Sequence, residues 1–339
     1  MNSRRYSIPC VLAVAMLIPS ATAQERQPDE LFPPVEPFQT GYLRVSDVHE
    51  VYYELCGNPR GKPVFVLHGG PGGGCHPNMR RLYDPQRFLI VLHDQRGAGR
   101  SRPFAELREN NTQNLVSDIE RLRRHLKLDR IRILGGSWGS TLALAYAEKH
   151  PEHVAGMVLR GVFTATDAEI EHFYGGGVRK LFPDTVATFE AALASAGKKL
   201  EPKQILALLQ SDDPAVRRRF AVAWTRYELK MSRLHWPDKQ LLGVDDDWNP
   251  YAFALLENHY MANRCFLQED QLCHDAARLK DIPITMVNGR YDVLCPPATA
   301  YRLHRLLPKS KLVIVEEAGH SQSEPGITKA LLRAIADFE

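Results

Sequence analysis

Short apolar runs that alternate with helical patterns are the feature of this sequence that most restricts its fold. Continuous apolar strands are buried on both faces, as in parallel sheets that are covered by helices. Leu and Ile side chains at positions 115, 119, 122 and 126 predict an intervening helix, with Asn111 or Thr112 as its cap. We therefore predict an α/β fold with a mostly parallel central sheet flanked by helices. The strand-like runs lie at 64–67, 88–92, 131–134, 154–159, 282–287 and 312–315, after a hairpin at 41–45 and 50–55.

The middle of the chain shows a different pattern. Residues 164–273 contain helical patterns, for example at 205–209 and 220–231, but no convincing strand run. A helical block inserted between strands of a parallel sheet is most simply a cap over one end of that sheet, where ligands bind in α/β folds. We predict a core formed by 24–163 and 274–339, and a helical cap formed by 164–273.

The amino terminus has the pattern of a cleavable secretory signal. Arg4 and Arg5 precede an apolar run at 10–18, which is followed by Ala21-Thr22-Ala23. This order of a basic start, a short apolar run and small residues favours a signal peptide over a buried helix. The run is too short to span a bilayer. We expect residues 1–23 to be removed on export to the periplasm or beyond, with no membrane segment in the mature form.

Charge and cysteine content exclude several functions. The 43 Lys and Arg nearly balance the 40 Asp and Glu, so the net charge of +3 does not favour nucleic-acid binding. The 13 His come without an H-E-x-x-H or a paired C-x-x-C, and we predict no metal site. Removal of Cys10 leaves five cysteines, so at least one thiol stays free. Cys265 and Cys273 are the pair favoured by proximity in the sequence, although spacing alone does not establish a bond.

A candidate nucleophile lies between a predicted strand and a predicted helix. Gly135-Gly136-Ser137-Trp138-Gly139 follows the run at 131–134 and precedes a helical pattern at 140–150. A G-x-S-x-G in this context is typical of a nucleophile elbow, a tight turn that exposes the serine hydroxyl. The alternative is a chance match in a chain with 23 glycines. The strand before it and the helix after it favour the elbow.

A serine nucleophile requires a base and a carboxylate that orients the base. Hydrolases with this elbow place the two partners after the serine in the order Asp or Glu, then His. Asp292 follows the run at 282–287, and His320 follows the run at 312–315. Each alone is explained equally well as an ordinary loop residue. Their joint placement after the last two strands predicts a Ser137–Asp292–His320 triad.

Acyl transfer also requires donors for the developing oxyanion. The glycine-rich segment 68–74 follows the strand at 64–67, where the second backbone donor belongs. We assign the N–H groups of Gly70 and Trp138 to this role, with the neighbouring glycine as the alternative to Gly70. A phosphate-binding loop is excluded because no Gly-Lys-Ser/Thr follows and Cys75 breaks the G-x-G-x-x-G register.

Five motifs together resemble those of the prolyl iminopeptidase (proline aminopeptidase) family of α/β-hydrolases, and the resemblance runs from about residue 41 to the C-terminus. It implies an α/β-hydrolase fold with a cap, and removal of an N-terminal proline from peptides without a metal or cofactor. The motifs are His-Gly-Gly-Pro-Gly-Gly at 68–73, Asp-Gln-Arg-Gly-Ala-Gly-Arg-Ser at 94–101, Gly-Gly-Ser-Trp-Gly-Ser at 135–140, Gly-Arg-Tyr-Asp at 289–292 and Gly-His-Ser at 319–321.

The resemblance also implies how the substrate amine is bound. An enclosed ammonium group requires compensating negative charge. Segments 224–228 and 257–260 look like the family's two amine-binding segments, which gives Glu228 and Glu257 this role. By themselves, glutamates in a cap are more often part of a solvated helix face. Arg160, after the strand at 154–159, is expected to hold the two carboxylates in place.

The proline ring requires an apolar pocket. Phe163, Phe173 and Cys295 occupy positions that resemble the family's pocket wall, with ordinary core packing as the alternative. Met261 stands where the family usually has an aromatic residue. Because methionine adapts its shape, we expect the pocket to accept residues besides proline.

The sequence thus predicts a serine exopeptidase that acts on peptides with a free N-terminal proline. One alternative is an amidase or esterase of the same fold that acts on another small acyl group. A second is a non-catalytic periplasmic binding protein on a hydrolase scaffold, against which the intact Ser137, Asp292 and His320 argue. The sequence leaves the natural peptide and the oligomeric state open.

Overall fold

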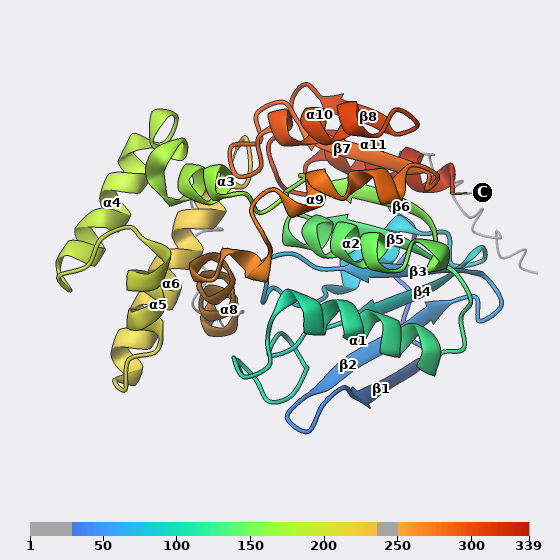
Figure 1. Ribbon diagram of the computed structural model, residues 1–339, viewed down its shortest axis with the longest axis horizontal. Helices are drawn as coiled ribbons and strands as arrows, with labels where there is room; N and C mark the ends of the chain where they lie inside the picture. The colour runs from blue at the N-terminus through green and yellow to red at the C-terminus, as the bar shows by residue number, and fades with distance from the viewer. Residues whose placement is uncertain (1–28, 236–249, 339) are drawn as a thin grey trace, which may run out of the picture.

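The computed structural model describes residues 29–235 and 250–338, so the predicted signal peptide at 1–23 lies outside the described residues. Its centre is an eight-stranded sheet in the order β1-β2-β4-β3-β5-β6-β7-β8 (Figure 1). β1 and β2 form the predicted hairpin, β2 pairs with β4 in the antiparallel sense, and the other pairs are parallel. The strands are β1 (Gln39–Arg44), β2 (Glu50–Gly57), β3 (Lys62–Leu67), β4 (Phe88–His93), β5 (Ile131–Gly136), β6 (Val154–Arg160), β7 (Ile284–Gly289) and β8 (Lys311–Val315).

The mostly parallel sheet is confirmed, and the strand boundaries differ from the predicted runs by one or two residues. The shift at the start of β7 has a clear local cause. The run predicted to start at residue 282 begins to pair only at Ile284. The N–H of Ile282 donates instead to Leu279 O, three residues earlier in a turn, at 3.0 Å. Pro283 has no N–H to give to the sheet. Ile282 and Pro283 therefore belong to the turn before β7 and not to the strand.

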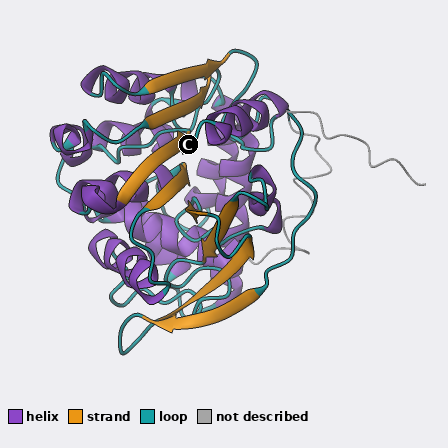
Figure 2. Ribbon diagram, turned by 90° about the vertical axis from the view of Figure 1, so that its right-hand side faces the viewer, coloured by secondary structure: helices purple, strands orange, loops and turns teal. Residues whose placement is uncertain are grey.

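Helices cover both faces of the sheet, as Figure 2 shows. Successive side chains of β3 point to opposite faces, so Phe65 and Leu67 pack in one apolar cluster and Val64 and Val66 in the other. The first cluster includes apolar side chains of three helices that cover one face of the sheet, besides those of helices from the middle of the chain, and the second includes those of the C-terminal helix. These helices are α1 (Thr112–His125), α2 (Trp138–Lys149) and α10 (Pro297–Leu306) on the first face, and α11 (Pro325–Ala336) on the second.

The predicted helix after residue 111 is present, and its cap is Asn111. The Asn111 side chain accepts a hydrogen bond from the N–H of Asn114 at 2.9 Å. This bond satisfies one of the N–H groups that the first helical turn leaves without a partner. Leu115, Ile119 and Leu122 are buried against the sheet, as their spacing predicts.

Between β6 and β7 the described residues form helices and no named strand. Most of these helices lie to one side of the sheet, at the left in Figure 1, whereas the last of them lies against α2. The exact residue boundaries of core and cap stay a prediction. The elements are α3 (Asp167–Glu171), α4 (Pro183–Ala194), α5 (Pro202–Leu209), α6 (Pro214–Met231), α8 (Pro250–Ala262) and α9 (Gln271–His274).

The expected pairing of Cys265 with Cys273 is wrong. Both residues carry free thiols, as do the other three cysteines of the described chain. The Cys265 sulfur packs against Met261 Sδ at 3.9 Å, whereas Cys273 lies on the separate helix α9. Burial raises the pKa of both thiols, which disfavours the reactive thiolate.

Among the helices of the described chain, none combines the length and the apolar character that crossing a bilayer requires.

Candidate active site

Ser137 occupies a sharp turn between β5 and α2. Its backbone has φ 58° and ψ −129°, a conformation that is strained for a residue with a Cβ atom. The turn leaves no room for side chains at the flanking positions: a Cβ on Gly135 would lie 2.2 Å from Gly139 O, and one on Gly139 would lie 2.1 Å from Leu67 O. The glycines of the motif are therefore required by the close approach of strand and helix.

Asp292 and His320 lie together in the loops after β7 and β8. His320 Nδ1 is 2.8 Å from Asp292 Oδ2, and both side chains are buried. The other carboxylate oxygen, Oδ1, accepts hydrogen bonds from the N–H groups of Leu294 at 3.1 Å and Cys295 at 2.8 Å. Asp292 is thus held in one orientation and can hold the imidazole in turn.

The opposite ring nitrogen of His320 contacts Arg160 and not Ser137. Arg160 Nη1 lies 2.9 Å from His320 Nε2 and 3.1 Å from His320 O. Because the guanidinium can only donate, Nε2 carries a lone pair and Nδ1 carries the proton that Asp292 accepts. The Ser137 hydroxyl interacts with the thiol of Cys295. His320 therefore has the tautomer of a general base, and its basic nitrogen is engaged by a cation.

Gly161 sets the position of the His320 ring. It has φ +54°, and a Cβ there would lie 2.8 Å from His320 Cε1 and 2.9 Å from Nδ1. We expect Gly161→Ala to displace the imidazole and to lower kcat by about a hundredfold, the usual cost of a misplaced catalytic group. Gly197→Ala is the matched control, because Gly197 has φ +66° and nothing lies within 4 Å of its added Cβ.

Both variants introduce the same backbone strain, so both should lower the melting temperature. Only Gly161→Ala should lower kcat, measured on folded protein. Equal kcat values for the two variants would show that the space around the His320 ring does not matter.

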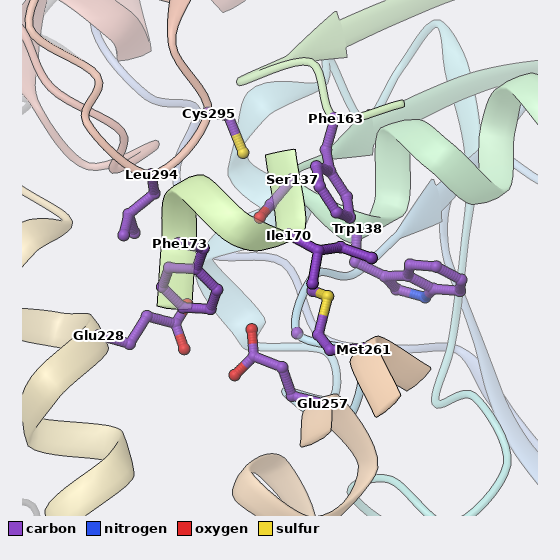
Figure 3. Close-up of a pocket in the computed structure, with 11 residues that line it drawn as sticks. Ser137, Trp138, Phe163, Ile170, Phe173, Glu228, Glu257, Met261, Leu294 and Cys295 are labelled. Atoms are coloured by element: carbon purple, nitrogen blue, oxygen red, sulfur yellow. The ribbon is translucent and has the colours of Figure 1, made fainter. Parts of the chain in front are cut away.

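A cavity brings together most of the residues that the sequence singled out (Figure 3). All four predicted pocket residues line it, and so do the predicted nucleophile, both proposed oxyanion donors and both cap glutamates. Ile170 of α3 and Leu294 also line it and were missed; neither belongs to a motif, although Leu294 directly precedes Cys295. The lining residues are Gly70, Ser137, Trp138, Phe163, Ile170, Phe173, Glu228, Glu257, Met261, Leu294 and Cys295.

Glu257 is buried and Glu228 is half-buried, and their carboxyl groups point into the cavity from α6 and α8 (Figure 3). Trp224 Nε1 donates a hydrogen bond to Glu257 Oε2 at 2.7 Å, while Glu228 Oε2 has no hydrogen-bond partner. Burial raises the pKa of both carboxyl groups, and the adjacent Glu228 raises the pKa of Glu257 further. The pair therefore tends to retain a proton unless a cation lies beside it.

Arg160 does not hold these carboxylates as expected. Its hydrogen bonds go to His320, and its influence on Glu228 is electrostatic at longer range, lowering the pKa of that carboxyl against the effect of burial. The reason is geometric. Arg160 is the last residue of β6, and from this sheet edge its side chain reaches the loop that carries His320.

Within residues 29–235 and 250–338, no group of three or more His, Cys, Asp or Glu side chains is arranged to hold a metal ion.

Comparison with known proteins first defines the class. Residues 62–326 match the family model described as alpha/beta hydrolase fold. An esterase from Exiguobacterium antarcticum has a similar structure, with a TM-score of 0.59 at 20% identity over 88% of this chain and 98% of the esterase. An alpha/beta fold family hydrolase from Bacillus anthracis str. Sterne has a TM-score of 0.63 at 18% identity, over 90% of this chain and 100% of that one. The predicted α/β-hydrolase fold is confirmed.

Similarity in sequence then identifies the family within this class. A protein named proline iminopeptidase from Xanthomonas citri is 48% identical over 309 residues, which cover 91% of this chain and 99% of the relative. Proteins of the same name are 45% identical in Arabidopsis thaliana, over 90% of this chain and 80% of the relative, and 40% identical in Neisseria gonorrhoeae, over 89% and 97%. The chain belongs to the proline iminopeptidase family, as its motifs indicated.

Proposed function

We propose that this protein is a serine exopeptidase that releases an N-terminal proline from peptides. The observation that carries the proposal is the pair of buried carboxyl groups, Glu228 and Glu257, in the cavity that also contains Ser137. Two acidic groups in an otherwise mostly apolar cavity are costly unless a cation joins them. A free N-terminal amine is such a cation, and it would lie next to the carbonyl that Ser137 attacks.

The proposed reaction follows the acyl-enzyme route. His320 Nε2 releases Arg160 and takes the proton of Ser137 Oγ as this oxygen attacks the carbonyl carbon of the first residue. Asp292 stabilises the imidazolium through Nδ1. The N–H groups of Gly70 and Trp138 bind the oxyanion, and the shortened peptide leaves with the proton from His320. Water then hydrolyses the ester on Ser137 by the same steps and frees proline.

The apolar wall would bind the pyrrolidine ring. Phe163, Phe173 and Cys295 supply rigid or compact surface, whereas Met261 is flexible and its sulfur contacts Cys265. We therefore include other small N-terminal residues among the proposed substrates.

A panel of aminoacyl 4-nitroanilides with free and N-acetylated amines tests the proposal. We expect the highest kcat/KM for the free prolyl substrate, lower values for other small residues, and a loss of at least a hundredfold on acetylation, because the blocked amine carries no charge for Glu228 and Glu257. Equal hydrolysis of free and acetylated substrates would instead indicate an amidase or esterase. Absence of turnover together with no labelling of Ser137 by a fluorophosphonate would indicate a binding protein.

The carboxyl pair also predicts a pH dependence. Its pKa values are raised in the empty site, so a falling pH protonates both groups and removes the charge that binds the amine. We expect kcat/KM for the prolyl anilide to fall by up to about tenfold per pH unit below neutrality. Hydrolysis of 4-nitrophenyl acetate, which has no amine, serves as the control. Identical acid limbs for the two substrates would exclude a contribution of the pair.

We also propose that residues 1–23 direct export and are then removed, on the basis of the sequence pattern alone. Expression in a bacterial host followed by fractionation and N-terminal sequencing tests this. A periplasmic or secreted protein that begins at Gln24 is expected, and an uncleaved protein in the cytoplasm would contradict it.

A further inference from the structure

Gln95 is a buried residue of the Asp94-Gln95-Arg96 motif, and the proposed reaction leaves it without a role. It follows β4, the strand beside β3 in the sheet, while β5 lies on the other side of β3. The turn after β3 carries Gly70, and the turn after β5 carries Ser137 and Trp138. Gln95 therefore stands at the same sheet edge as both turns that are proposed to supply oxyanion donors.

Three hydrogen bonds of Gln95 join these two turns. Its side-chain Nε2 donates to His68 O at 2.8 Å, and its main-chain N–H donates to His68 Nε2 at 3.0 Å. Its Oε1 accepts from Trp138 Nε1 at 2.9 Å. One side-chain amide thus contacts the residue two positions before Gly70 and the side chain of the other donor residue.

His68 extends this connection toward Gly70. Because its Nε2 accepts from Gln95, its Nδ1 carries the proton and donates to Gly69 O at 2.9 Å. Burial lowers the pKa of His68, which keeps the ring neutral and preserves this arrangement. The sheet register Leu67↔Gly135 is the last pair between β3 and β5, so beyond it the two turns are not held together by the sheet ladder.

We infer that Gln95 is a positioning residue that fixes the Gly70 and Trp138 donors relative to each other, through His68 on one side and the Trp138 indole on the other. Preorganised donors stabilise an oxyanion only if their separation matches it. The inference rests on the oxyanion donors assigned in the proposed function. It deepens that function by naming the residue that aligns these donors.

The test compares Gln95→Met with Asn110→Leu. Each replaces a buried amide with an apolar side chain of similar size. Asn110 is the matched control because its Nδ2 also donates to main-chain carbonyls, Arg96 O and Glu106 O at 2.9 Å each, and its Oδ1 also accepts from an aromatic residue, Tyr260 at 2.8 Å. Trp138→Phe is a second variant, which removes the indole N–H that donates to Gln95 Oε1, together with part of the ring, and keeps the main-chain N–H that is the proposed donor.

Two substrates are used for each variant: a prolyl 4-nitroanilide and 4-nitrophenyl acetate. The ester forms the same oxyanion but has no amine. The fraction of competent protein is measured as the end point of fluorophosphonate labelling, and the melting temperature is recorded. Rates are then expressed per competent site.

We expect Gln95→Met to lower kcat for both substrates by tenfold to a hundredfold, less than the loss caused by deleting an oxyanion donor, with KM for the anilide changed by less than threefold. Trp138→Phe should lower kcat by a smaller factor, and the double variant should be no worse than Gln95→Met alone. Asn110→Leu should lower the melting temperature but leave kcat within twofold.

The inference is overturned if kcat per competent site is unchanged in Gln95→Met, or if Asn110→Leu loses as much. If Gln95→Met does not fold, an unchanged kcat in Trp138→Phe overturns it. A wild-type protein that cleaves the ester but not the prolyl anilide would contradict the proposed function alone, because the ester still reports on Gln95.

Discussion

Ser137→Ala is expected to lower kcat/KM for the prolyl anilide by about 10⁴-fold or more, because it removes the oxygen that forms the proposed acyl-enzyme. Burial raises the pKa of the neighbouring Cys295 thiol, which disfavours the thiolate that could replace this oxygen. The cavity keeps both glutamates and the apolar wall, so binding of the substrate should persist. Alanine retains the Cβ atom, and the strained backbone at φ 58° should therefore remain. Steady-state kinetics and calorimetric titration with prolinamide measure the two effects separately.

Ser117→Ala is the control for this variant. Ser117 lies on α1, and its hydroxyl donates to Gln113 O at 2.9 Å within the same helix. Its loss should leave both kcat and KM unchanged. Activity of Ser137→Ala within tenfold of the wild type would exclude Ser137 as the nucleophile.

Glu257→Gln is expected to reduce kcat/KM for free-amine substrates by about 30-fold to several thousandfold. This range corresponds to about 2–5 kcal/mol, the usual cost of removing one partner of a buried charge pair. The amide oxygen can still accept from Trp224 Nε1, so the wall of the site should be preserved. N-acetylated substrates, which do not use the charge, should be cleaved no more slowly than by the wild type.

The same substitution should make the empty protein more stable at neutral and alkaline pH. The pKa of Glu257 is raised in the folded state, so the folded protein binds more protons than the unfolded chain. Stability is then lost as the pH rises through the folded-state pKa, and a neutral glutamine removes this loss. The melting temperature of Glu257→Gln relative to wild type should increase from pH 5 to pH 9.

Glu148→Gln separates the two effects, because it should reproduce the gain in stability at higher pH without a change in substrate binding. Glu148 is buried on α2, and burial raises its pKa to about 9, but it does not line the cavity. We expect its replacement to leave KM for the prolyl anilide unchanged. Wild-type binding of free-amine substrates by Glu257→Gln would remove the main support for the proposed function.

Local features of the chain were predictable because they depend on neighbouring residues. The predicted apolar runs form strands of the sheet, and Asn111 caps its helix, as its side chain and its position before the helix indicate. The elbow at Ser137 was predicted from glycines that the crowded turn requires. The start of β7 was predicted two residues too early. The apolar pattern begins at Ile282, but this residue belongs to a turn and Pro283 has no N–H for the sheet.

Side-chain contacts between segments that are far apart in the chain could be predicted only in part. Asp292 and His320 were expected together because both follow neighbouring strands, and they are 2.8 Å apart. The direction of the other His320 nitrogen toward Arg160 was not predictable, since it depends on the mutual orientation of two side chains from different strands. The free thiols of Cys265 and Cys273 have the same explanation. The two residues are close in the sequence, but the Cys265 sulfur packs against Met261 and Cys273 lies on another helix.

The sequence by itself determined the strand order along the chain, the strand–Ser137–helix turn and the order of its triad candidates, because periodicity and turn chemistry are encoded over a few residues. Only the tertiary structure decided that Glu228 and Glu257 face the same cavity as Ser137, and that Gln95 joins the turns that follow β3 and β5. Such contacts join residues far apart in the chain, and their geometry is set by how whole helices and strands pack.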